Sequence, residues 1–209
     1  MAELNVDQLR ARLWVLLAVD ACDRAGLAPM PKDRFHRLIF LSNCLAQLFG
    51  ADPPAKRIIK YIRGPFYPDI QWQLDRLATI GWLRLSDAAL EPDKFGPWLR
   101  ANYQITAAGV EVVEAMRKTP LGHSTRNYIE ELVFAFARLD LRRLDQIALN
   151  ELNWLPAGEG ALITFEDADL NLAIRKAREF EQLAPNILTD RFREQIQLYL
   201  RYIEESEAA

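Results

Sequence analysis

The chain has 209 residues, of which half are hydrophobic and about a quarter are charged, with a formal net charge of −3. This ordinary globular composition can bury a hydrophobic core. Residues 1–119 carry 16 Lys and Arg against 13 Asp and Glu, whereas residues 120–209 carry 10 against 16. Neither part has the basic excess of a dedicated nucleic-acid binder.

The apolar runs and the cysteines restrict where the chain can act. The longest apolar runs, such as LWVLLAV at 13–19, are too short to span a bilayer. Glu3 and Asp7 stand where an export signal would need positive charge, so we expect a cytoplasmic protein with no membrane contact. Cys22 and Cys44 lie inside apolar helical patterns, which predicts buried free thiols rather than a disulfide.

The first part of the chain begins with two predicted helices, at 6–25 and 32–49. Apolar residues recur at helical spacing in both, and Gly26 and Gly50 are suitable ends. The isoleucines and the tyrosine of 57–63 then favour a strand or an irregular approach to one.

A third helix is predicted after the turn at Gly64-Pro65. Pro68 suits its first turn, Asp69 suits its positive end, and Gly81 closes it. The inward face is expected to consist of Ile70, Leu74, Leu77 and Ala78.

Two strands and another helix complete this part. Short strands are predicted at 82–85 and 102–105, with a polar loop between them, and Thr106 is the natural N-cap of the helix that begins at ITAAG. The element order is that of a winged helix-turn-helix domain. We therefore predict a winged helix with a small β-wing over residues 1–119.

The second part, residues 120–209, reads as an all-helical extension. Its predicted helices cover 124–139, 141–152, 167–183 and 189–205, and Thr189 is a plausible cap of the last. The expected fold class is thus mainly α, with a winged-helix domain at 1–119 and a helical extension at 120–209.

Catalytic motifs are missing from the sequence. It contains no Gly-rich phosphate loop, no His-Glu-x-x-His, no Cys-x-x-Cys and no Gly-x-Ser-x-Gly. His36 is expected to be a partly buried, hydrogen-bonded side chain, and His123 a cap or surface residue. The acidic run at 166–169 lacks the Gly and the distal Glu of a calcium loop and suits a helix N-terminus instead. We therefore predict a protein that is not an enzyme and takes no metal or cofactor.

The third helix would enter the major groove if the domain bound DNA. Its expected outward side chains are Asp69, Gln71, Gln73, Asp75 and Arg76, with Trp72 as a further candidate. One cation, Arg76, against two acids is a poor match to phosphate, although the two glutamines could read adenine. The basic cluster just before it consists of Lys56, Arg57, Lys60 and Arg63. It could contact phosphates, lie as a solvated edge or pair with the acidic second part of the same or another chain. The candidate nucleic-acid contacts are Lys56, Arg57, Lys60, Arg63, Gln71, Gln73, Arg76 and Lys94.

Aromatic residues near the same helix and in the wing loop favour a protein contact. Phe95 and Trp98 lie in the loop, where aromatics are more typical of a protein interface than of a phosphate contact. The alternative is that both tuck under their own loop. The candidate partner contacts are Phe66, Tyr67, Trp72, Phe95 and Trp98.

Three segments carry a family resemblance: FHRLIFLSNCLAQLFG, KYIRGPFYPDIQWQLDRLATIGWL and YQITAAG. They resemble the small middle components of prokaryotic ABC-three-component systems, which belong to anti-phage defence of the Lamassu kind. The GPFYP turn and the helix before it are also similar to the Panacea antitoxin domain, in which a Gly-Pro-aromatic-x-Pro turn leads into a similar helix. The resemblance covers roughly residues 10–115.

The two resemblances have different implications. The first implies a non-enzymatic accessory subunit that docks on an SMC-like ATPase and works with an effector. The second implies an antitoxin that neutralises a toxin by direct binding. We expect an adaptor that binds a partner protein, and the alternative is a winged-helix DNA-binding regulator or antitoxin.

Overall fold

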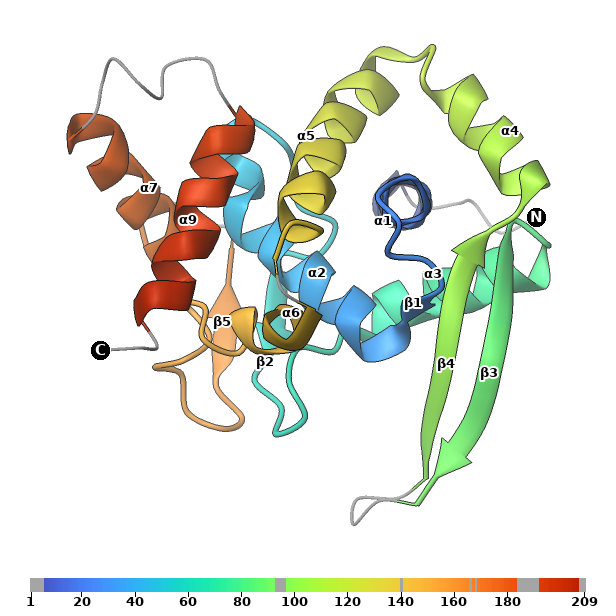
Figure 1. Cartoon of the computed structure of the whole chain (residues 1–209), viewed down its shortest axis with the longest axis horizontal. Coiled ribbons are helices and arrows are strands. Elements are labelled where there is room, and N and C mark those ends of the chain that lie inside the picture. The colour runs from blue at the N-terminus through green and yellow to red at the C-terminus, as the bar shows by residue number, and fades with distance from the viewer. Residues whose placement is uncertain are drawn as a thin grey trace.

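The computed structural model describes residues 6–92, 97–139, 141–165, 167, 169–183 and 192–206. The chain is mainly helical, with a three-stranded and a two-stranded antiparallel sheet (Figure 1). Up to residue 119 the elements are α1 (Val6–Arg24), β1 (Met30–Pro31), α2 (Lys32–Leu45), the 3-10 helix η1 (Ala46–Phe49), β2 (Arg57–Ile59), α3 (Pro68–Thr79), β3 (Leu83–Glu91), β4 (Trp98–Ile105) and α4 (Ala107–Met116). They are followed by α5 (Pro120–Phe136), α6 (Leu141–Ile147), β5 (Leu162–Thr164), α7 (Leu172–Leu183) and α9 (Phe192–Ser206).

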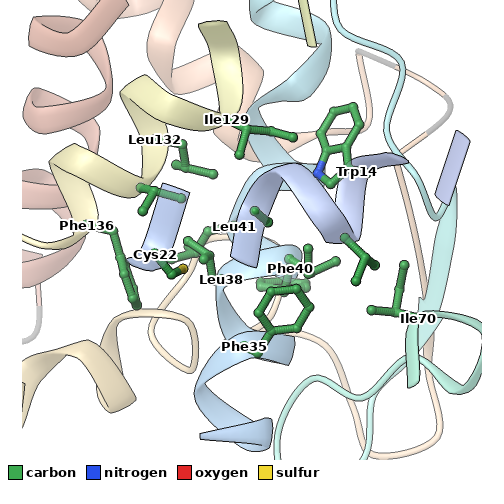
Figure 2. Packing of buried hydrophobic residues seen from close by; sticks show 14 of the residues in the cluster. Trp14, Cys22, Phe35, Leu38, Phe40, Leu41, Ile70, Ile129, Leu132 and Phe136 are labelled. Atoms are coloured by element: carbon green, nitrogen blue, oxygen red, sulfur yellow. The ribbon is translucent and has the colours of Figure 1, made fainter. Parts of the chain in front are cut away.

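Helix α1 is the centre of the molecule. Every residue from Leu13 to Cys22 is buried, and the helix contacts α3, α4, α5 and β4. A helix covered on all sides carries apolar residues all round rather than in one stripe. Figure 2 shows Trp14 and Cys22 of α1 among side chains of α2 and α5. Cys22 and Cys44 are both buried and free, which confirms the prediction for the thiols.

The sheet has the order β1-β4-β3, with antiparallel neighbours. The prediction of short strands at 82–85 and 102–105 was too narrow, because β3 and β4 continue far into the expected loop. Glu91 lies opposite Trp98, beyond an irregularity in register between Ser86 and Ala89. In Figure 1 this hairpin extends well away from the helices.

The start of α4 is fixed to the start of β3. Thr106 is the N-cap, as predicted: its Oγ1 accepts a hydrogen bond from the Gly109 backbone N–H at 3.2 Å. The same hydroxyl lies 2.7 Å from the Gly81 carbonyl oxygen. A Cβ at position 109 would collide with the Trp82 carbonyl oxygen, so only glycine allows this close approach.

The second part of the chain is not all-helical, which corrects the prediction. Strand β5 pairs antiparallel with β2, with Ile58 opposite Ile163. The stretch before and after β5 looked like a break between helices, and its three-residue strand is too short to give a recognisable pattern. Residues on both sides of the expected boundary at 119/120 belong to one hydrophobic core.

A buried carboxylate organises this second part. Glu151 Oε2 accepts hydrogen bonds from the backbone N–H groups of Asn153 (2.7 Å) and Trp154 (3.2 Å). Its Oε1 accepts from the Tyr199 hydroxyl at 2.6 Å and from Asn153 Nδ2 at 2.9 Å. Burial raises the pKa of Glu151, although these donors act in the opposite direction.

Asn171 connects the same site to α7 and α2. Its Oδ1 accepts from the backbone N–H groups of Ala173 (3.0 Å) and Ile174 (3.4 Å), so it acts as the N-cap of α7. Its Nδ2 donates to the Cys44 carbonyl at 2.8 Å. The prediction that the helix starts at 167 was wrong, because α7 begins at Leu172. Asp167 Oδ1 instead accepts from the Asp169 backbone N–H, a hydrogen bond typical of turns. The expected cap Thr189 lies outside the described residues.

Ion pairs join the basic first part to the acidic second part. Asp145 in α6 lies 3.1 Å from Arg34 Nε and 2.9 Å from Arg37 Nη1, both of α2. Burial alone would raise the pKa of Asp145, but the two guanidinium groups lower it below its ordinary value. Arg24 of α1 pairs with Glu130 of α5 in the same way. Part of the charge asymmetry in the sequence is therefore neutralised within the chain.

Candidate partner-binding surface

Helix α3 is positioned by α1 and β3, against which it packs. Ile70, Leu74 and Leu77 are buried in these contacts, as the spacing predicted. The remaining side chains of α3 decide what the helix can present to a partner.

Gln71 is held inside the domain by a chain of hydrogen bonds. His36 Nδ1 accepts from the Tyr67 backbone N–H at 3.3 Å, which places the ring proton on Nε2, 3.1 Å from Gln71 Oε1. Gln71 Nε2 in turn donates to the Tyr103 hydroxyl and to Asp75 Oδ1, both at 2.8 Å. Burial lowers the pKa of His36 to about 4, so the ring is neutral near pH 7.

Gln73 is also turned inward. The sequence placed Gln71 and Gln73 on the outward face, but Gln73 is buried and its Oε1 accepts from Arg12 Nε at 3.0 Å. The helix is covered on a wider arc than its apolar stripe because α1 lies on one side and Tyr103 of β4 on the other. In this conformation both amides are engaged within the protein, so they do not present free groups to base edges.

The exposed face of α3 consists of Asp69, Trp72, Asp75 and Arg76, which we call the α3 face. Trp72 is 57% exposed. The guanidinium carbon of Arg76 lies 5.9 Å from the centre of the Trp72 ring. One cation and two carboxylates around an exposed indole suit a polypeptide better than a row of phosphates.

Phe66 and Trp98 pack on each other instead of standing free. Their ring centres are 5.2 Å apart in an edge-on arrangement. Lys32 Nζ lies 3.7 Å and the Arg63 guanidinium carbon 4.6 Å from the centre of the Trp98 ring. Lys32 also donates to the Leu99 carbonyl, and burial lowers the pKa of its ammonium group. The Trp98 ring therefore packs against Phe66, Lys32 and Arg63, which all lie outside its own hairpin.

The other predicted partner contacts differ in position. Tyr67 is buried, so its ring does not belong to an exposed surface. Phe95 lies outside the described residues, as does Lys94 among the candidate nucleic-acid contacts. Trp72 is the predicted aromatic contact that the described structure leaves most exposed.

The basic cluster is divided between exposed and engaged side chains. Lys60 Nζ donates to the carbonyl oxygens of Trp154 (2.7 Å) and Leu155 (3.3 Å), and Arg63 lies against Trp98. Lys56 and Arg57 are exposed. Lys60 therefore contacts backbone carbonyls in the second part of the same chain and not its acidic side chains.

The sequence missed an exposed apolar surface around β2 and β5. Ile59 and Leu162 lie opposite each other across the two strands and are both exposed. Lys60 connects this strand pair to Leu155. The β2–β5 patch consists of Ile59, Tyr61, Ile62, Leu155 and Leu162. The sequence feature that could have revealed this patch is the isoleucine-rich run at 57–63. That run indicated a strand but did not show which of its faces would be exposed to solvent.

Within the described ranges, no three His, Cys, Asp or Glu side chains come together as a metal site. No helix in the same residues is both long and apolar enough to cross a membrane. Burial raises the pKa of both cysteine thiols, which makes them poor nucleophiles.

No family model matches the chain, and neither a curated protein nor a solved structure matches it.

Proposed function

We propose that this chain is a non-enzymatic adaptor that binds a partner protein through the α3 face. The observation that carries the proposal is the exposed indole of Trp72 beside Arg76. Trp and Arg are the residue types that contribute most to protein interfaces, and the two acids around them disfavour a phosphate backbone.

A winged-helix assignment of the first part agrees with this reading. The order α1, β1, α2, α3, β3, β4, with η1 and β2 between α2 and α3, and the sheet order β1-β4-β3 support it. The adaptor would use the winged-helix shape for a protein contact, with α3 as the contact helix and the β3–β4 hairpin as the wing.

The family resemblance suggests the kind of partner. An SMC-like ATPase with its effector, in a prokaryotic anti-phage defence complex, is the partner that we propose. A toxin, as in the Panacea resemblance, is the second protein candidate, and both would be bound by direct contact.

DNA binding by a regulator or antitoxin is the alternative function. The exposed side chains of Lys56, Arg57 and Arg76 favour it. The hydrogen bonds that hold Gln71 and Gln73 inside the protein weaken it, because few groups are left to read bases.

Co-purification tests the proposal. The tagged chain is co-expressed with the reading frames that flank its gene, as wild type, Trp72→Ala and the control Leu183→Ala, which changes an exposed leucine of α7. We expect the wild type and the control to retain a partner and Trp72→Ala to lose it, with circular dichroism unchanged.

Duplex DNA is the counter-test. If the purified chain alone binds a labelled duplex tightly, and the affinity falls steeply with salt, the chain is a DNA-binding protein and the proposal is wrong. Retention of the partner by Trp72→Ala would also contradict it.

A further inference from the structure

Strand β2 has a free edge. Its hydrogen bonds to β5 alternate along the strand: the Lys56 carbonyl accepts from the Phe165 N–H, and the Lys60 N–H donates to the Ala161 carbonyl, both at 2.8 Å. In an antiparallel ladder the residues between such pairs point their N–H and C=O groups the other way. Those residues are Arg57 and Ile59, and in the described part of the chain β2 pairs with no strand on that side.

A hollow of about 490 Å³ lies beside this strand. The β2 residues Arg57 to Ile59 line it together with the segment that begins α3, from Phe66 to Asp69. Leu162 and Ala55 complete the lining. The hollow adjoins the β2–β5 patch through Ile59 and Leu162 and is large enough for several residues of an extended chain.

The charges around the hollow are unequal. Arg57 lines it and also lines a second hollow of about 450 Å³, together with Lys56 and Asp69. Neither Lys56 nor Arg57 forms an ion pair within the described residues, whereas Arg10 in the second hollow is paired with Asp7 and Asp52. Three cations, Arg10, Lys56 and Arg57, line the second hollow against two carboxylates, Asp7 and Asp69. Its lining therefore carries one excess positive charge, which complements an acidic side chain.

We propose that this hollow takes an extended, acidic segment of another polypeptide, which adds to the free edge of β2 as a strand. The main chain of the segment would pair with Arg57 and Ile59, and alternate apolar side chains would lie on Ile59, Leu162 and Phe66. An acidic side chain would face Arg57 and Lys56. A single strand suits the hollow better than the β2 strand of a second copy of this chain. In that second copy, residues 66–69 also lie beside β2 and would enter the hollow with it.

A peptide library tests the proposal. A phage-displayed library of random dodecapeptides is panned against the full chain, and enriched peptides are synthesised and titrated by fluorescence anisotropy. We expect the enriched peptides to share alternating apolar residues with an acidic residue. Hydrogen exchange of the Arg57 and Ile59 amides should slow when such a peptide binds.

Two variants test whether the peptide binds at the free edge of β2 and not on another surface. Ile59→Pro removes an N–H that points away from β5, so the β2–β5 pairing can persist while strand addition is blocked. Arg57→Glu reverses the charge without altering the strand. We expect each to weaken binding by about tenfold or more, and the control Arg201→Glu, an exposed arginine of α9, to leave it unchanged.

Several outcomes would overturn the proposal. No enrichment above uncoated wells, or equal affinity of the peptides for wild type and Arg57→Glu, would refute it. Binding that is lost in Trp72→Ala but kept in Ile59→Pro would place the peptide on the α3 face instead. The hollow does not include Trp72, so this proposal and the adaptor function can fail separately.

Discussion

His36 shows what a single buried side chain contributes to this protein. Its two ring nitrogens connect the main chain before α3 to Gln71, and through Gln71 to Tyr103 and Asp75. The sequence indicated a partly buried, hydrogen-bonded histidine. It did not identify Gln71 as the partner, because 35 positions separate the two residues and only the tertiary fold brings them together.

The buried His36 should make stability depend on pH. The unfolded chain binds a proton on this histidine below about pH 6.5, whereas the folded chain does so only near pH 4. The free energy of unfolding should therefore fall as the pH is lowered through this window, by about 3 kcal/mol in total. Urea unfolding across the window measures it.

The variant His36→Gln isolates this contribution. Burial raises the pKa of Glu151, so that carboxyl stabilises the folded chain toward low pH and opposes His36 over part of the range. Glu151 contributes equally in wild type and in His36→Gln. Subtracting the slope of the unfolding free energy against pH in the variant from that in wild type therefore leaves the contribution of His36. Equal slopes would mean that His36 titrates normally in the folded chain.

At the scale of elements, the two helix starts that the sequence proposed had different outcomes. The cap at Thr106 was confirmed because its capping partner, the Gly109 backbone N–H, lies only three residues further along the chain. The start at 167 was wrong because the cap of α7, Asn171, is selected by a contact with Cys44 far away in the sequence. The local sequence pattern predicts helix caps whose partners lie nearby in the sequence. It does not predict helix caps that depend on residues far away in the sequence.

Asn171→Ala should destabilise the protein by about 2 kcal/mol, because it removes the cap of α7 and leaves the buried Cys44 carbonyl without this donor. Thermal or urea unfolding measures the change. The matched control is Asp167→Ala, at the helix start that the sequence predicted, whose exposed side chain should contribute less than about 0.5 kcal/mol. A larger effect at Asp167 than at Asn171 would contradict the observed start of α7.

The predicted orientation of α3 was correct for its apolar side and wrong for its glutamines. Periodicity identified Ile70, Leu74 and Leu77 because burial of apolar side chains repeats with the helix. It could not show that Gln73 would be buried and Gln71 partly buried, since polar residues turn inward only where specific partners such as His36 and Arg12 are present.

At the scale of the whole molecule, the two parts of the chain depend on each other. Helix α5 packs on α1, β5 pairs with β2, and the ion pairs of Asp145 and Glu130 cross between the parts. The sequence treated residues 120–209 as an extension because no motif revealed these contacts. One shared hydrophobic core makes the parts one structural unit.

A shared core predicts cooperative unfolding. Calorimetry should give a single heat-absorption peak whose calorimetric and van't Hoff enthalpies agree. Two separate transitions would show that the parts on either side of residue 119 fold independently.

The central claim is that the α3 face contacts a protein and not DNA. The most direct measurement replaces Trp72 with the photo-crosslinking residue p-benzoylphenylalanine and irradiates the full chain in its native cells. The account predicts a crosslinked species that resists nuclease and is digested by protease to peptides of a second protein. A species that loses its added mass on nuclease treatment, or no crosslinked species at all, would contradict it.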